Sequence, residues 1–199
     1  MSTVFKIEFD YDQLLQQAKS IEGVADQLPY ALSLAMNRSA DVTRNLLIRA
    51  TWPTHVKQRN ASFIAASLTT RDARASKQSL AVEIYDKLDR GNLQMQAKGD
   101  TRTPHGGSSL AVPVSSVPKG SRGVPARLRP KNLPTVVRKG DVLYAKDKKG
   151  RLRLLYVLKH QTNVPKRVPF YEDFAVSMQR ELERNIPLAV AKAMATRRR

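Results

Sequence analysis

Histidines are the first side chains to consider for acid–base or metal chemistry, and this chain has three: His55, His105 and His160. They lie about 50 residues apart, with no HExxH or other spacing that would bring two imidazoles to one metal ion. Cysteine is absent, which excludes thiolate metal sites, cysteine nucleophiles and disulfides. We therefore expect the histidines to lie on the surface or in loops, and we expect neither a metal site nor a cofactor.

Two other patterns could be mistaken for sites. Segment 104–109 reads PHGGSS, but a phosphate cradle needs a preceding strand, a fixed glycine spacing and a helix behind it. Glu181 and Glu183 are close to being paired carboxylates, yet at i,i+2 on a helix they do not face each other. With Arg180 and Arg184 beside them, they are typical of a solvated helix face. No catalytic constellation remains, so we expect no enzyme.

Positive charge is the dominant chemical feature of the sequence. The chain has 35 Lys and Arg against 17 Asp and Glu, a formal net charge of +18. Residues 98–167 hold 17 basic residues and only three acidic ones. Such a field attracts nucleic acid, an anionic membrane or an acidic protein surface. The interface residues chosen from charge and expected exposure are Arg127, Arg129, Lys131, Lys148, Lys149, Arg151, Arg197, Arg198 and Arg199.

The basic hairpin leaves two interpretations open. It carries Lys146, Lys148, Lys149, Arg151 and Arg153. A solvated hairpin usually bears charge, and lysines protect exposed strand edges from aggregation. Equally, these side chains could bind phosphates or an acidic protein. No helix-turn-helix, zinc-finger or RNP-like pattern is present, so nucleic-acid contact would be with the backbone and sensitive to salt.

Hydrophobic periodicity indicates the elements of the first half. It predicts a strand at 4–10, a helix carrying Leu14, Leu15, Ala18 and Ile21, a helix at 26–51 stopped by Trp52-Pro53, a short helix at 61–67 capped by Asn60, and strands at 67–71 and 79–85.

The second half begins with a long segment rich in proline and glycine, 98–140, in which only 110–114 resembles a strand. Loops of this length are usually functional or disordered. Order returns with two clear strands at 142–146 and 151–158, joined by a tight turn at 147–150. A final helix is expected from about 174 to 196, with Asp173 as its cap.

These elements predict an α+β fold, in which a small antiparallel sheet packs with the N-terminal and C-terminal helices. We expect one domain over residues 1–199, with 98–140 as a long basic loop or arm. No apolar run approaches the roughly 20 residues that span a bilayer. The N-terminus lacks the pattern of a signal peptide, so we expect no export by a signal and no membrane partner.

Several features together resemble the minor tail protein Z, or tail completion, family of long-tailed bacteriophages. The first is the Ala-rich helix at 31–44, ALSLAMNRSADVTR, around an Ala-Met-Asn-Arg core. The others are the basic middle with its hairpin, the approach from Val164-Pro165 to Val168-Pro169, and a final helix broken at Ile186-Pro187 with a basic end. The proline-rich segment 104–134 departs from the family pattern.

The resemblance implies a structural virion protein at the neck of the particle. Such proteins form α+β rings, often hexameric, between the head–tail connector and the tail tube or terminator, and carry no catalytic residues. The expected partners are therefore other copies of the chain, the connector, and the terminator or tube proteins. DNA in the channel is a further expected contact, and assembly would occur in the host cytoplasm. The alternative is an accessory protein that binds nucleic acid without sequence specificity.

Overall fold

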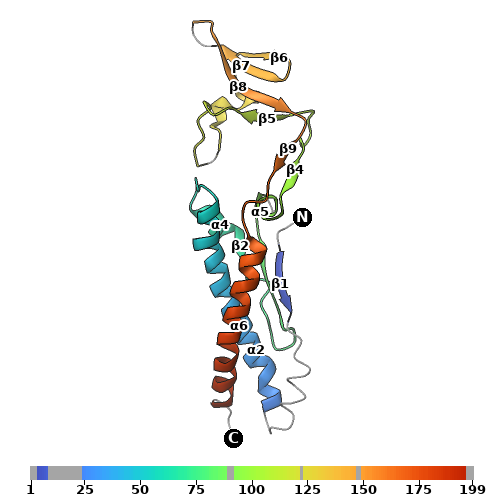
Figure 1. The fold of residues 1–199 in the computed structure, drawn as a ribbon, viewed down its shortest axis with the longest axis vertical. Helices are drawn as coiled ribbons and strands as arrows, with labels where there is room; N and C mark the ends of the chain where they lie inside the picture. Colours follow the sequence, from blue (N-terminus) through green and yellow to red (C-terminus); the bar gives the residue numbers. More distant parts are fainter. Residues whose placement is uncertain (1–3, 9–23, 89–91, 122, 147–148, 196–199) are drawn as a thin grey trace. The chain divides into compact units, whose positions relative to one another are not determined.

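The computed structural model describes residues 4–8, 24–88, 92–121, 123–146 and 149–195 (Figure 1). It divides into two compact units. The helical unit comprises Met1–Lys57, Ala61–Ala97 and Arg167–Arg199, and the sheet unit comprises Gln58–Asn60 and Lys98–Lys166. The sequence predicted a single domain with 98–140 as a loop or arm. That segment instead belongs to the sheet unit, because its short apolar runs pair with strands that follow in the chain.

Two long helices form the framework of the helical unit. Helix α2 (Val24–Leu46) continues into a π-helical segment, η1 (Leu47–Thr51), and then into the short helix α3 (Trp52–His55). Helix α6 (Phe170–Ala195) runs beside α2 and packs against it (Figure 1). The shorter helices are α4 (Ser62–Ser67) and α5 (Asn92–Lys98).

Three details of these helices differ from the prediction. The helix over 26–51 is confirmed, but the chain stays helical past Trp52-Pro53 and becomes extended only at Val56. In a regular α-helix the ring of a proline clashes with the carbonyl group four residues earlier. The π-helical segment η1 comes just before Pro53, and its wider turn leaves more room for the proline ring. The N-cap of α4 is Ala61 rather than Asn60. Helix α5 was not predicted at all.

A three-stranded antiparallel sheet, in the order β1-β3-β2, completes the helical unit. The strands are β1 (Val4–Glu8), β2 (Leu68–Thr69) and β3 (Ala81–Asp86), which confirms the three predicted strands with shorter bounds. The predicted alternation also holds, since Leu80, Val82 and Ile84 are all buried. The helix predicted around Leu14 to Ile21 lies outside the described residues.

Aromatic side chains join the sheet to the helices. Phe170, at the start of α6, is fully buried, with its ring centroid 5.9 Å from that of Phe5 on β1. The Phe170 ring also stacks on Trp52, with centroids 5.8 Å apart and the ring planes 16° from parallel. Aromatic pairs at these distances add to the stabilisation from buried area. The core of the helical unit therefore lies between its sheet and the α2–α6 pair.

Small and polar side chains fill the seam between α2 and α6. Thr43 Oγ1 lies 3.0 Å from Ser177 Oγ, and Asn185 Nδ2 donates a hydrogen bond to Ser39 Oγ at 3.1 Å. All four side chains are buried, and such pairs fix the register of two helices because leaving a buried polar group unpaired is costly. Three alanines of α2, Ala31, Ala35 and Ala40, are also buried.

The sheet unit contains two antiparallel sheets. Strands β4 (Asp100–Arg102) and β9 (Thr162–Val164) form a pair, and a four-stranded sheet has the order β5-β8-β7-β6. Its strands are β5 (Leu110–Pro113), β6 (Val136–Lys139), β7 (Val142–Lys146) and β8 (Leu152–Lys159). The predicted hairpin of β7 and β8 and the predicted strand at 110–114 are confirmed. The predicted α+β class is confirmed as well.

Candidate interaction surfaces

The sheet unit carries most of the charge of the protein. Its residues include 17 Lys and Arg against three Asp, a formal charge of +14 out of the +18 of the whole chain. This charge is borne by about 70 residues, so the unit as a whole is an electrostatic target for anions. The kind of anion that fits depends on how the cations are distributed over the two faces of the four-stranded sheet.

One face of the four-stranded sheet, the inner face, is covered by the segment that links β5 to β6. Leu143, Leu155 and Tyr156 are buried there against Val117 of that segment. Tyr156 Oη donates a hydrogen bond of 2.6 Å to the carbonyl oxygen of Leu128, which ties the covering segment to the sheet. Burial raises the pKa of the Tyr156 phenol, and the positive charge of Arg129 lowers it by a smaller amount.

Three of the predicted interface residues lie on this covering segment. Arg127 belongs to the 3₁₀ turn η2 (Ala126–Leu128), and Lys131 belongs to η3 (Pro130–Asn132). Arg129 lies between the two turns and donates from Nε to the Val124 carbonyl oxygen at 3.3 Å. All three side chains are exposed. The structure thus brings these three cations together on the covering segment of the inner face.

The opposite face, the outer face, is apolar at its centre and rimmed by lysine. Residues paired across an antiparallel sheet share a face, and alternate residues along a strand share it too. The register places eight apolar or aromatic residues on the outer face: Leu110, Val112, Val137, Val142, Tyr144, Leu152, Leu154 and Val157. It places Lys139, Lys146 and Lys159 on the same face, all exposed.

The outer face is incompletely covered. Leu152 and Leu154 are 42% and 38% exposed, and none of the eight apolar residues belongs to a core cluster of the described chain. No Asp or Glu of the described residues takes part in the pairing that defines this face. An apolar patch with a polar rim is the usual form of an interaction site.

The other predicted interface residues lie elsewhere or outside the described chain. Lys149 and Arg151 are exposed in the connection between β7 and β8. Lys148 and the terminal Arg197, Arg198 and Arg199 lie outside the described residues. The prediction named Lys146 only as one cation of the basic hairpin, and it missed Lys139 and Lys159. Which residues of neighbouring strands share a face depends on the pairing register of the strands, and a local sequence pattern does not give that register. The alternating pattern at 142–146 was the available signal.

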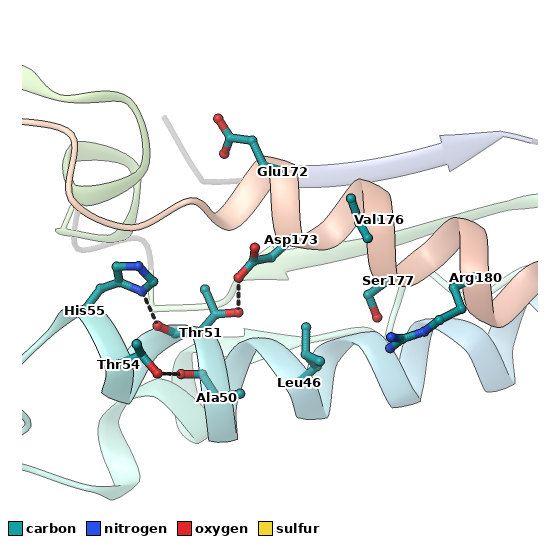
Figure 2. A pocket seen from close by; sticks show the side chains of 10 residues that line it. All are labelled: Leu46, Ala50, Thr51, Thr54, His55, Glu172, Asp173, Val176, Ser177 and Arg180. Atoms are coloured by element: carbon teal, nitrogen blue, oxygen red, sulfur yellow. Dashed lines mark hydrogen bonds between the residues drawn. The ribbon is translucent and has the colours of Figure 1, made fainter.

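The helical unit has a hollow of about 400 Å³ between the end of α2 and the start of α6 (Figure 2). Figure 2 shows Asp173 of α6 and Thr51 of η1 pointing toward each other across it, joined by a hydrogen bond of 2.5 Å from Thr51 Oγ1 to Asp173 Oδ2. The sequence predicts Asp173 as the cap of a helix starting at Phe174. Because α6 begins at Phe170, Asp173 lies in its first turn and binds the neighbouring helix instead.

His55, Asp173 and Ser177 all line this hollow, and these are the residue types of a hydrolytic triad. Their hydrogen bonds serve the helix pair instead. His55 Nδ1 lies 2.9 Å from the Thr51 carbonyl oxygen, Asp173 accepts from Thr51, and Ser177 pairs with Thr43. No hydrogen bond among these described residues joins two of the three, so a nucleophile–base pair is not formed.

A second hollow of about 460 Å³ lies farther along the same two helices. Leu34 and Arg38 of α2 and Leu188 and Lys192 of α6 are among the residues that line it. Across the described chain, no group of three or more His, Asp or Glu side chains is arranged to hold a metal ion. None of the described helices combines the length and the apolar character that a membrane crossing requires.

Comparison of the chain with protein-family models, with curated proteins and with solved structures found no match.

Proposed function

We propose that the protein is a structural subunit of a tailed-phage particle, which joins the head–tail connector to the tail tube or terminator as part of a neck ring. In this proposal the sheet unit docks on an acidic surface of a neighbouring particle protein. The copies of the chain form a ring, with hexameric order as the expectation from the family resemblance.

The observation that carries the proposal is the outer face of the sheet unit. Its apolar centre would gain stability by burial against another protein, at about 25 cal/mol per Å² of apolar area removed from water. Its rim of Lys139, Lys146 and Lys159 favours a partner whose own rim is acidic. A surface of this composition serves assembly rather than catalysis.

A second function is favoured by the +14 charge of the sheet unit, namely binding of nucleic acid without sequence specificity. Three phosphate contacts from the lysines of the outer face would give a slope of log K against log salt of about −2.7. The apolar centre argues against this role, because a phosphate backbone leaves Val142, Tyr144 and Leu154 without a partner that excludes water.

The proposal is tested by producing the protein together with the proteins encoded beside it and measuring the native mass of the complexes. We expect a closed ring of copies bound to a connector, terminator or tube protein. A chain that stays monomeric in the presence of those neighbours would contradict the proposal. Tight binding of duplex DNA by the same sample, with the salt slope given above, would favour the second function.

A further inference from the structure

The two hollows of the helical unit lie along the α2–α6 pair, and the strip of surface that includes both is called the groove. The residues at one end, Leu34 and Leu188, line the second hollow, and those at the other end, Leu46 and Val176, line the first. The helices are antiparallel, and Thr43 pairs with Ser177 between these ends. Each end thus places one apolar residue from α2 opposite one from α6.

The apolar residues of this groove are unusually exposed. Leu34 is 41% exposed, Val176 is 68% exposed and Leu188 is 56% exposed. Val42 is 39% exposed, and its i,i+4 spacing to Leu46 and Arg38 places it between the two hollows. Single exposed apolar residues are ordinary, but a row of them along one groove marks an interaction site.

The groove has a fixed shape and a fixed length. The buried pairs Thr43–Ser177 and Asn185–Ser39 lie directly beneath it and hold the register of its two walls. Leu34 and Leu46 are 12 residues apart, as are Val176 and Leu188, so the two apolar ends are separated by about 18 Å at 1.5 Å per residue. A helix presents residues i and i+11 on one face at nearly this separation.

Charge in the groove selects an acidic occupant. Cations follow its length: Arg180 lines the first hollow, and Arg38 and Lys192 line the second. Arg184 is exposed on α6, four residues from both Arg180 and Leu188, so its helical spacing places it between the hollows. Arg180 lies 3.6 Å from the largely buried carboxylate of Glu181 and keeps 63% of its side chain exposed. The carboxylates that line the groove, Glu172 and Asp173, lie together at one end, and Asp173 is bound to Thr51.

We propose that this groove docks an amphipathic α-helix of an acidic partner protein. Apolar side chains of that helix at i and i+11 fill the two hollows, those at i+4 and i+7 cover Val42, and acidic residues on its flanks meet the four cations. A second copy of the same groove does not fit, because it would set arginines against arginines. Nucleic acid does not fit either, because it offers nothing to fill two apolar hollows.

The proposal can be tested with a labelled synthetic helix of about 18 residues, long enough to span both hollows. The probe carries leucines at i, i+4, i+7 and i+11 on an alanine background, with glutamates on both flanks. The matched probe has lysine in place of every glutamate. We expect saturable binding of the glutamate helix in fluorescence anisotropy, and binding of the lysine helix at least about tenfold weaker because of like-charge repulsion.

The protein variant that tests the site is Val176→Glu combined with Leu188→Glu. Both side chains are more than half exposed, so the fold should tolerate the change, and circular dichroism checks this. The glutamate helix should bind this variant at least about tenfold more weakly than it binds the unaltered protein. The matched control is Leu154→Glu, on the outer face of the sheet unit, which should leave probe binding unchanged.

Five results would overturn the proposal. The first four are equal binding of the two probes, unchanged binding by the double variant, displacement of the glutamate helix by duplex DNA, and a dimer of the unaltered protein that the double variant loses. Absence of saturation up to about 1 mM probe would also overturn it, since that corresponds to only about 4 kcal/mol. Failure of this proposal is distinguishable from failure of the proposed function, because probe binding reports on the groove and the native mass of the complexes reports on the outer face.

Discussion

Replacing Tyr156 by Phe tests how the sheet unit holds its covering segment. The phenol ties this segment to β8 through the 2.6 Å bond to the carbonyl oxygen of Leu128, and Arg153 of β8 adds a second tie by donating from Nη2 to the Ser116 carbonyl oxygen at 3.1 Å. A net hydrogen bond contributes about 0.5–1.5 kcal/mol, and Leu128 is only partly buried, so its carbonyl can recover some solvation. We expect a loss of about 1 kcal/mol. In a unit of about 70 residues this lowers the Tm by roughly 4–8 °C.

The same substitution should change the dependence of stability on pH. Burial raises the pKa of Tyr156 above its usual value of 10.0, so the folded state favours the neutral phenol. Its contribution to the free energy of unfolding is complete below pH 10.0 and is lost as the pH rises through the raised pKa, because the unfolded chain ionises first. The stability difference between the unaltered protein and the Tyr156→Phe variant should therefore shrink above pH 10.0.

Thermal unfolding followed by circular dichroism at a series of pH values measures both effects. The control is Tyr144→Phe, on the outer face of the same sheet, which should change stability by less than about 0.5 kcal/mol. If Tyr156→Phe shifted the Tm no more than Tyr144→Phe, and the difference did not change with pH, the role assigned to this hydrogen bond would be refuted.

Three further predictions concern packing, backbone conformation and the helix seam. Phe170→Ala removes a fully buried ring between Phe5 and Trp52 and should cost about 3–5 kcal/mol in denaturant unfolding of the helical unit; a cost below about 1 kcal/mol would contradict the core described above. Gly99→Ala should destabilise the β4–β9 pair in denaturant unfolding, because Gly99 has φ +75° and a Cβ there would lie 3.0 Å from the backbone nitrogen of Lys166. The control Gly107→Ala has open space around the added Cβ and should be neutral in the same measurement. Asn185→Ala should cost about 1–3 kcal/mol by leaving buried polar groups without a partner, and a neutral result would show that the polar seam does not hold the helices.

The sequence was sufficient for elements whose pattern is local. Strands β7 and β8 alternate clearly, and α2 and α6 show helical spacing over many residues, so all four were predicted close to their observed bounds. The division into two units could not be predicted, because a period-2 pattern identifies a strand's two faces without saying which core buries one of them. The short runs at 110–113 and 136–139 become strands only because β7 and β8 pair with them.

The candidate surfaces were less predictable than the fold. Lys139, Lys146 and Lys159 come from three strands and share a face only through the pairing register, which shifts at a bulge beside Leu143 and Tyr144. The groove of the helical unit was missed for a similar reason. Its walls come from segments more than 130 residues apart, and the register between them is set by buried pairs such as Thr43–Ser177.

We propose that the outer face of the sheet unit docks on an acidic particle protein. The most direct measurement is zero-length cross-linking of amines to carboxylates in the complex with the proteins encoded beside this one, read out by mass spectrometry. We predict cross-links from Lys139, Lys146 and Lys159 to Asp or Glu residues of one neighbouring protein. Cross-links confined to other lysines of a formed complex, with these three unreacted, would contradict the claim.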